Sequence, residues 1–149
     1  MLKFKKMKDI RKDAGITQEE LSNILRIKKD TYSKYESGGA IPSMEIVFNF
    51  SKYFGYRIDF VLLEGSKRES VSFHGVSYNK QLIAKNLKYL RLSEKLSQDD
   101  LASKLGVTQS AIHRYENGLS NPSIKVLNCY RKSFGFSFHD VCTTDLSKK

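Results

Sequence analysis

Apolar residues recur along this chain at the spacing of one helix face. Ile83, Leu87 and Leu90 stand at positions i, i+4 and i+7, which is the period of an amphipathic α-helix. The same spacing begins at Lys3, where a lysine takes the place of the first apolar residue. We therefore predict that a helix opens each of these two regions.

The next helix in each region carries its own start and stop signals. Thr17 and Ser97 precede acidic residues and are expected N-caps, because their hydroxyls can accept hydrogen bonds from amides of the first turn. The apolar pattern ends at Leu25 and Leu105, so these second helices are short. Gly106 follows Leu105 directly and predicts a left-handed residue at the helix end.

Three further helices are predicted in the second region. Thr108 caps a third helix that reaches Asn117, after which Gly118 and Pro122 interrupt the chain. The remaining helices are expected to run from Ser123 to Phe134 and from Ser137 to Cys142, with counterparts at 43–54 and 57–63.

These parallels reflect an internal repeat with an offset of 80 residues and no gaps. Identical pairs include Gln18 and Gln98, Tyr35 and Tyr115, Glu36 and Glu116, Pro42 and Pro122, and Phe54 and Phe134. A chain of 149 residues has room for two small domains of this size. We predict an all-α protein with domains at 1–64 and 81–142, a linker at 65–80 and a C-terminal tail at 143–149.

The predicted linker has a different pattern. Residues 70–78 alternate polar and apolar side chains around His74-Gly75, which is typical of two strands joined by a turn. An isolated pair of strands is only marginally stable in water. We therefore expect an extended connector that holds at most a short paired segment.

Residues 98–123 resemble the Cro and lambda-repressor class of helix-turn-helix proteins, also called the xenobiotic-response-element type. The resemblance rests on small Ala102 where the two helices cross, Gly106 at the turn, and apolar Val107 and Ile112 at inward positions. It implies two tandem five-helix, lambda-repressor-like helix-turn-helix domains joined by a short extended linker.

The first domain departs from the family pattern at three positions. Ser22 replaces the crossing alanine, Arg26 the turn glycine and Tyr32 the inward aliphatic residue. A residue with a Cβ in the left-handed conformation costs roughly 1 kcal/mol relative to glycine. A buried tyrosine needs space for its ring and a partner for its hydroxyl. Two roles therefore stay open for the first domain: contact with DNA, and a structural or dimerising role.

The resemblance also implies which residues contact DNA bases. In the family the third helix enters the major groove, and the second helix lies across the backbone. Arginine suits guanine and glutamine suits adenine, because each forms two hydrogen bonds with the edge of its base. The implied base contacts are Gln109, Ser110, His113 and Arg114, and their counterparts Lys29, Asp30, Ser33 and Lys34, although Asp30 opposes the phosphate field.

A second set of residues is expected at the DNA backbone, whose contacts fix the register of the protein. Gln18 and Gln98 resemble the phosphate-contacting glutamine that begins the second helix in the family. Arg11 and Arg91 match a family arginine that forms an internal ion pair with a glutamate, with phosphate contact as an added role. The full set of phosphate candidates is Gln98, Gln18, Thr108, Asn117, Ser120, Arg91, Arg11 and Lys28.

Other conspicuous side chains have structural interpretations. Tyr35 and Tyr115 occupy inward positions of the family. Cys142 matches core Leu62 and Cys129 matches Asn49, and both cysteines are expected to pack, with partial exposure of Cys129 left open. Most lysines of the opening segment are expected to be solvated. Six aromatic residues recur at helical spacing and are expected in the core or at a dimer surface, rather than in a stacking platform for single-stranded nucleic acid: Phe48, Phe50, Phe54, Tyr130, Phe134 and Phe138.

Composition narrows the class of partner. The chain carries 26 Lys and Arg against 16 Asp and Glu, a net charge of +10, which favours a polyanion. Two cysteines and isolated histidines predict no disulfide framework, no metal site and no cofactor. No apolar run is long enough to cross a bilayer, and no secretory segment opens the chain, so we expect a cytoplasmic protein.

These observations predict a sequence-specific, double-stranded DNA-binding transcriptional regulator, most simply a repressor that occupies an operator. We expect no enzyme, because the chain shows no clustered acids, phosphate-cradling glycine loop or nucleophile-base pair. An alternative is a protein-interaction module, such as an antitoxin that binds a toxin with one domain and regulates its own promoter with the other.

The arrangement on DNA has two alternatives. The 16 residues of the predicted linker reach roughly 50 Å at about 3.3 Å each, which exceeds the about 34 Å between successive major grooves on one face of DNA. One chain can therefore place both domains on DNA as a pseudo-dimer. We favour a homodimer, because helices four and five form the dimer surface in many family members and keep apolar residues here.

Overall fold

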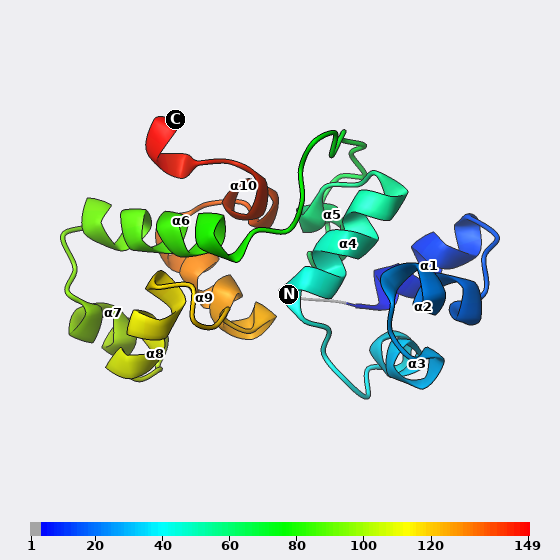
Figure 1. Cartoon of the computed structure of the whole chain (residues 1–149), viewed down its shortest axis with the longest axis horizontal. Coiled ribbons are helices and arrows are strands. Elements are labelled where there is room, and N and C mark those ends of the chain that lie inside the picture. The colour runs from blue at the N-terminus through cyan, green and yellow to red at the C-terminus, as the bar shows by residue number, and fades with distance from the viewer. Residues whose placement is uncertain (1–3) are drawn as a thin grey trace. The chain divides into compact units, whose positions relative to one another are not determined.

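The computed structural model describes residues 4–149, and within that range it contains α-helices and one short 3-10 helix but no β-strand. Contacts divide the chain into two units between Gly75 and Val76 (Figure 1). The predicted all-α architecture with two tandem helix-turn-helix units is confirmed. Lys3, which opens the first predicted helix, lies outside the described residues. Across residues 4–149, no helix combines the length and apolar content needed to span a membrane.

The first unit contains five helices. They are α1 (Lys5–Asp13), α2 (Gln18–Leu25), α3 (Lys29–Ser37), α4 (Met44–Phe54) and α5 (Ile58–Leu62). Its core gathers side chains from all five, among them Met7, Leu21, Tyr32, Val47, Phe48, Phe50 and Ile58. The sequence-based interpretation of Phe48 and Phe50 as core residues is confirmed.

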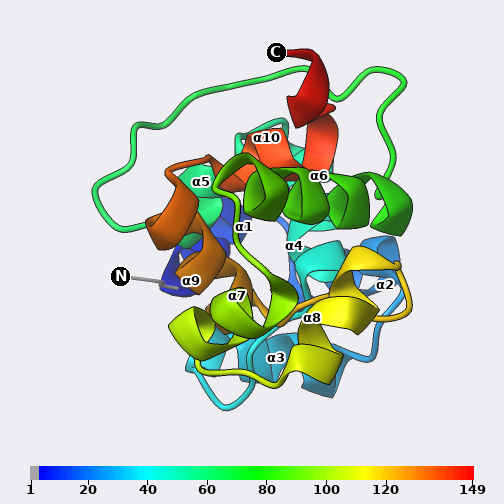
Figure 2. The same cartoon turned by 90° about the vertical axis from the view of Figure 1, so that its left-hand side faces the viewer.

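The second unit repeats this order and adds a short final element. Its helices are α6 (Lys80–Ser93), α7 (Gln98–Leu105), α8 (Gln109–Glu116), α9 (Ile124–Phe134) and α10 (Phe138–Thr143), followed by the 3-10 helix η1 (Leu146–Lys148). In this unit α6 lies over α7 and α8, and α10 packs on α6 (Figure 2). With the offset of 80 residues, α2 and α7 have the same bounds, and so do α4 and α9.

The predicted N-caps of the second helices are confirmed. The Thr17 hydroxyl accepts a hydrogen bond from the Glu20 amide at 3.1 Å, and the Glu20 carboxylate accepts one from the Thr17 amide at 2.7 Å. Ser97 and Asp100 form the same reciprocal pair in the second unit. Each pair satisfies two amides that a helix start leaves without partners.

The turns that follow the first and second helices have left-handed residues in both units. Arg26 has φ 57°, and its counterpart Gly106 has φ 69°. In the turn after the first helix the glycine lies in the first unit instead: Gly15 has φ 71°, and its counterpart Lys95 has φ 56°. The left-handed conformation expected for position 26 is thus adopted by an arginine, at a steric cost that glycine avoids.

The other two departures from the family pattern in the first unit, Ser22 and Tyr32, are both buried. Ser22 is buried at the helix crossing, and its hydroxyl donates to the Glu19 carbonyl at 2.7 Å. This local bond satisfies the hydroxyl without a partner on another helix. The Tyr32 ring is fully buried, as an inward position requires.

The first half of the predicted linker packs on the first unit. Residues 68–73, which we name the linker strap, run antiparallel to the turn between α4 and α5. The Val71 amide donates to the Gly55 carbonyl at 2.9 Å, and Ser70 forms a single β-bridge with Tyr56. Phe73 is buried edge-on against Phe48. The short paired segment therefore joins the linker to the first unit instead of forming a hairpin within it, while the turn at Gly75 is present.

The residues after α10 are anchored in a similar way. Leu146 is buried, and its amide donates to the Asn86 side chain at 2.9 Å. Asp145 forms an ion pair with Lys85 at 2.6 Å, and the hydrogen bonds from Lys85 and Ser147 lower the pKa of Asp145 to about 2. The segment predicted as a C-terminal tail is thus attached to α6 as far as η1.

Lys6 has a structural role that its place in a lysine-rich segment concealed. Its ammonium donates to the carbonyls of Phe60 and Leu63 at 2.8 and 2.6 Å, where α5 ends. The counterpart Asn86 donates to the carbonyls of Val141 and Thr144 at the end of α10. The same repeat position therefore caps the fifth helix in both units, with different chemistry.

Candidate nucleic-acid interface

The second unit holds its two short helices at a closely packed crossing. Leu101 and Ala102 on α7 and Ile112 on α8 are buried, and Gly106 turns the chain between the two helices. Thr108 caps α8 by accepting from the Ala111 amide at 3.1 Å. The small Ala102 at the crossing lets the helices approach closely, as predicted.

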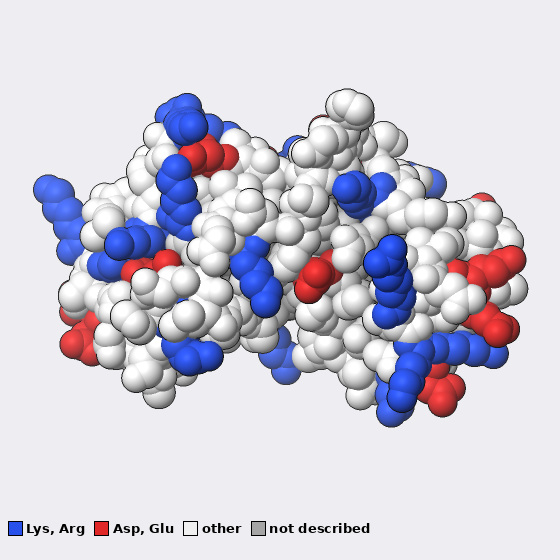
Figure 3. Space-filling model, in the orientation of Figure 1, with Lys and Arg blue, Asp and Glu red and all other residues white. Residues whose placement is uncertain are grey.

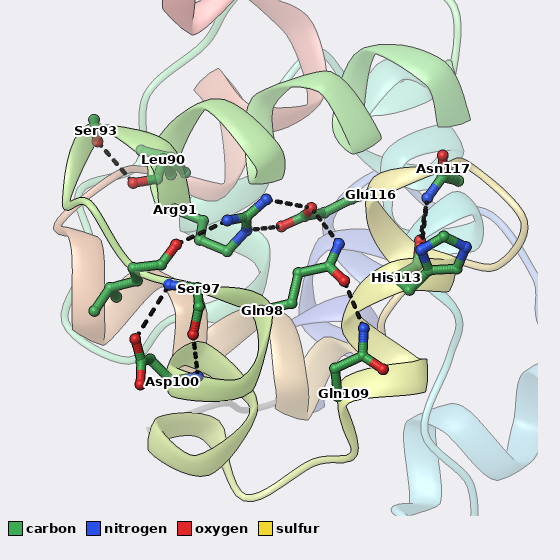
Figure 4. Close-up of polar contacts among 11 residues, drawn as sticks. Leu90, Arg91, Ser93, Ser97, Gln98, Asp100, Gln109, His113, Glu116 and Asn117 are labelled. Carbon is green, nitrogen blue, oxygen red and sulfur yellow. Dashed lines mark hydrogen bonds and ion pairs between the residues drawn. The ribbon is translucent and has the colours of Figure 1, made fainter.

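An ion pair joins the first helix of this unit to the end of α8. Arg91 Nε donates to Glu116 Oε1 at 2.6 Å, and Nη2 donates to Oε2 at 3.0 Å (Figure 4). The remaining Arg91 nitrogen donates to the Leu96 carbonyl at 2.8 Å. Hydrogen bonding to Glu116 raises the pKa of Arg91, so the guanidinium stays charged. All three nitrogens are used inside the unit, which confirms the predicted ion pair.

Gln98 extends this network to the start of α8. Its amide nitrogen donates to Glu116 Oε2 at 3.0 Å, and its amide oxygen accepts from Gln109 Nε2 at 2.6 Å (Figure 4). Gln98 and Gln109 are the first residues of α7 and α8. The sequence offered a signal for this bond, because both helices begin with glutamine, but the bond itself depends on the crossing geometry.

The remaining base candidates of the second unit lie together on the exposed surface of α8. Ser110, His113 and Arg114 are exposed, and within the described residues the side chains of Ser110 and Arg114 form no hydrogen bond or ion pair. Asn117 is also exposed, and its amide donates to the His113 carbonyl at 2.7 Å. Ser120 is half-buried in the loop that follows. The structure thus places the base candidates of this unit on one helix, with Asn117 and Ser120 directly after it.

The first unit keeps the ion pair but not the link to its third helix. Arg11 donates to Glu36 at 2.6 and 3.1 Å, and Gln18 donates to Glu36 at 2.8 Å. Burial raises the pKa of Glu36, but hydrogen bonds from Arg11 and Gln18 outweigh it, so the net pKa is lowered. Lys29 stands at the place of Gln109, but among the described residues its ammonium forms no hydrogen bond with Gln18. The first unit therefore has no equivalent of the bond that Gln109 donates to Gln98.

The exposed surface of α3 is basic with one opposing charge. Lys28, Lys29 and Lys34 are exposed, Asp30 is exposed beside them, and Ser33 is half-buried. The surface around α3 shows basic side chains with an acidic one among them, whereas basic side chains elsewhere on this face are scattered over both units (Figure 3). Lys28 precedes α3 without a side-chain cap, in contrast to Thr108 before α8.

Each unit also buries one tyrosine beside its ion pair, but from different helices. Tyr32 of α3 and Tyr130 of α9 are fully buried, and their repeat counterparts are Ile112 and Phe50. Within the described residues neither hydroxyl forms a hydrogen bond of normal geometry. Burial raises the pKa of both tyrosines, and the nearby carboxylates Glu36 and Glu116 raise it further. Both hydroxyls therefore stay protonated at neutral pH.

The other expectations for individual side chains are met in part. Cys142 is buried, as predicted, whereas Cys129 is exposed and does not pack in the core. Tyr35 and Tyr115 are only half-buried, so their rings lie at the edge of the core. Phe54 and Phe134 are likewise half-buried, each at the end of its helix. Among residues 4–149, no three His, Cys, Asp or Glu side chains converge into a metal-binding group.

Comparison with known proteins identifies the family of both units. The helix-turn-helix family profile matches residues 7–61 and again 87–137. Over 64 residues the chain is 33% identical to the antitoxin PezA of Streptococcus pneumoniae, an alignment that covers 43% of this chain and 40% of PezA.

Two further relatives are named as regulators of transcription. One, from Methanocaldococcus jannaschii, is itself described as an uncharacterized helix-turn-helix regulator and is 42% identical over 55 residues, 37% of this chain and 83% of the relative. The other is the transcriptional repressor RstR of the cryptic phage CTXphi from Vibrio cholerae, 36% identical over 53 residues, 36% of this chain and 48% of RstR. The chain therefore spans less than half the length of PezA and of RstR.

Proposed function

The chain belongs to the Cro and lambda-repressor class of the helix-turn-helix family, and from this premise we propose that it is a sequence-specific transcriptional regulator that binds double-stranded DNA. In this proposal α8 enters the major groove and α7 lies across the backbone. The protein acts by binding and not by catalysis, and it works in the cytoplasm beside the DNA.

The observation that carries the proposal is the network from Arg91 through Glu116 and Gln98 to Gln109. It fixes the side chain at the first position of α8, while Arg114 on the same helix is exposed and forms no side-chain hydrogen bond or ion pair within residues 4–149. A side chain held in one conformation loses less entropy when it binds a base. We assign Gln109 to an adenine and Arg114 to a guanine, with Ser110 and His113 at neighbouring positions.

Backbone contacts come from the ends of the same two helices. Gln98 and Thr108 lie at the starts of α7 and α8, where helix amides favour a phosphate. Asn117 and Ser120 follow α8 on the other side. Arg91 and Arg11 have their nitrogens occupied inside the units, so we assign them the role of positioning Gln98 and Gln18 rather than a direct contact with phosphate.

The first unit contributes mainly charge in this proposal. Lys28, Lys29 and Lys34 supply phosphate contacts that depend little on base sequence, and Asp30 limits how closely α3 approaches the backbone. Gln18 and Ser33 are the remaining residues of the first unit that we propose to contact DNA. Lys29 lacks the glutamine bond that orients Gln109, so α3 discriminates bases less than α8 does.

The test begins with selection of bound sites from random duplexes by the full chain, followed by two matched substitutions. Arg114 and Lys34 occupy the same repeat position. Arg114→Ala should relax discrimination at one operator position by about 1 to 3 kcal/mol, because a bidentate guanine contact is lost. Lys34→Ala should weaken binding to all duplexes alike. Equal loss of specificity from both substitutions, or none from Arg114→Ala, would refute the assignment of α8.

A homodimer on an operator is part of the proposal. Repression then follows if the occupied site overlaps a promoter and excludes polymerase. Sedimentation of the chain with the selected duplex gives the stoichiometry. Two chains on a site with twofold symmetry support the homodimer, whereas one chain on two unlike half-sites supports the pseudo-dimer.

A second candidate function is an antitoxin that binds a toxin with one unit and regulates its promoter with the other. The similarity to the antitoxin PezA favours this candidate. This candidate is tested by co-expressing the chain with the product of each gene that lies next to the gene for this chain. A neighbouring product that arrests growth alone, and forms a stoichiometric complex with the chain that restores growth, would establish this role.

A further inference from the structure

The first unit has a groove between the end of α2 and the exposed side of α4, lined by apolar, polar and charged side chains. Its volume is about 970 Å³. The walls include Ile24 and Ile27 from the end of α2 and the turn after it, and Ile46 and Tyr53 from α4. Ile24 is 41% exposed and Tyr53 is 50% exposed. Single exposed apolar residues are ordinary on protein surfaces, but residues that line one groove mark a site of interaction.

The repeat shows that the fold does not require this apolar surface. At the equivalent positions of the second unit, Lys104 replaces Ile24 and Ser133 replaces Tyr53. The helices α7 and α9 nevertheless have the same bounds as α2 and α4. The exposed apolar side chains of Ile24 and Tyr53 are therefore particular to the first unit, whereas Val107 and Val126 keep the positions of Ile27 and Ile46 apolar in the second.

The rim of the groove is charged with a positive excess. Arg26 and Lys52 line it together with one carboxylate, Glu45. Arg26 holds its side chain there from a left-handed backbone conformation, which glycine adopts at the equivalent turn of the second unit. Backbone strain of this kind persists where the surrounding structure or a function maintains it. The groove thus combines apolar walls with a cationic edge.

We propose that this groove binds an amphipathic helix of a partner protein, with apolar residues on one face and acidic residues on its flanks. Ile46 and Tyr53 are two helical turns apart on α4, so the wall extends about 10 Å along the helix. That length matches anchors at positions i, i+3, i+4 and i+7 of a helix laid in a groove. Acidic flanks pair with Arg26 and Lys52. The site is separate from α8 and adds to the proposed binding of DNA.

The probe is a labelled helical peptide of about 15 residues, long enough to retain some helix in water, with leucines on one face, glutamates beside them and alanines behind. A matched peptide has lysine in place of every glutamate. We expect the full chain to bind the glutamate peptide at least tenfold more tightly than the lysine peptide. Equal affinities, or no binding of either peptide at about 1 mM, the weak end of specific affinities, would overturn the proposal.

Variants taken from the second unit identify the site. Ile24→Lys with Tyr53→Ser should weaken the glutamate peptide at least tenfold, while circular dichroism and affinity for the selected duplex stay unchanged. Arg26→Gly should also weaken binding of the peptide, whereas Lys95→Gly, which relieves the same backbone conformation in the second unit, should not. Unchanged peptide affinity in the double variant would overturn the assignment.

A second copy of this chain is the competing occupant. Sedimentation of the chain without peptide or DNA tests it. A dimer that Ile24→Lys dissociates, and that the glutamate peptide does not dissociate, would overturn the proposal by assigning the groove to self-association. Loss of duplex binding in Arg114→Ala with peptide binding intact would show that the two sites act separately.

Discussion

At the scale of residues, the repeat provides an internal comparison for left-handed turn positions. In the turns after its first and second helices, each unit has one left-handed glycine and one left-handed basic residue: Gly15 and Arg26 in the first unit, Lys95 and Gly106 in the second. The conformation is therefore imposed by the fold and not by the residue. Both basic residues accept a local steric cost, and Arg26 lines the groove beside α4.

Glycine at either position should stabilise its own unit. Arg26→Gly and Lys95→Gly should each raise the free energy of unfolding by up to about 1 kcal/mol, because relief of the Cβ clash exceeds the added entropy of the unfolded chain. Hydrogen exchange of the full chain, followed by mass spectrometry of peptides from each unit, assigns the effect. Gly106→Arg is the reverse control and should destabilise the second unit. A destabilising effect of Lys95→Gly would show that its side chain makes a contact that outweighs the strain.

At the scale of elements, prediction succeeded where the signal was local. The ends of α2, α4, α7 and α9 follow from residues that act within one turn, such as Ser43 and Ser123, whose hydroxyls accept from Ile46 and Val126. The linker strap and the role of Lys6 depend on contacts with residues far along the chain. No periodicity reports such contacts, and a lysine-rich segment predicts solvated side chains.

For the candidate site, as for the helices, the sequence predicted the positions of residues but not their contacts with distant partners. The positions of Ser110, His113 and Arg114 on α8 follow from helix period and the resemblance, and the structure leaves them exposed. The Gln98–Gln109 bond and the groove beside α4 arise from how helices cross. Tertiary packing decides both, which explains why the residues were identified while their partners were not.

The unequal caps of the third helices lead to a second prediction. Thr108 caps α8, whereas Lys28 offers α3 no acceptor. Lys28→Thr should therefore stabilise the first unit by about 1 kcal/mol, and Thr108→Lys should destabilise the second by a similar amount. Unit-resolved hydrogen exchange measures both effects. Since Lys28 is also a phosphate candidate, Lys28→Thr should weaken DNA binding while it stabilises the fold. If stability and affinity rise together, Lys28 does not face the DNA.

At the scale of the whole molecule, the net charge is divided unevenly. Residues 1–64 carry 12 basic and 9 acidic groups, and residues 81–149 carry 11 and 6. The more positive unit is also the one with the glutamine network and the capped α8. The second unit therefore combines the larger net positive charge with the proposed base contacts. The first unit combines a basic α3 with the groove beside α4, which suits weak backbone contact together with a protein partner.

Salt dependence separates these contributions in the full chain. The logarithm of affinity falls with the logarithm of salt concentration by about 0.9 for each phosphate that a basic side chain neutralises, because bound counterions are released. Lys28→Ala with Lys34→Ala should therefore reduce the slope by about 2 and leave the ranking of selected duplexes unchanged. Gln109→Ala should alter the ranking with little change in slope, because glutamine carries no charge. Titrations at several salt concentrations with a selected and a mismatched duplex measure both quantities. A slope unaffected by the paired lysine substitution would remove α3 from the DNA and leave the groove as the main function of the first unit.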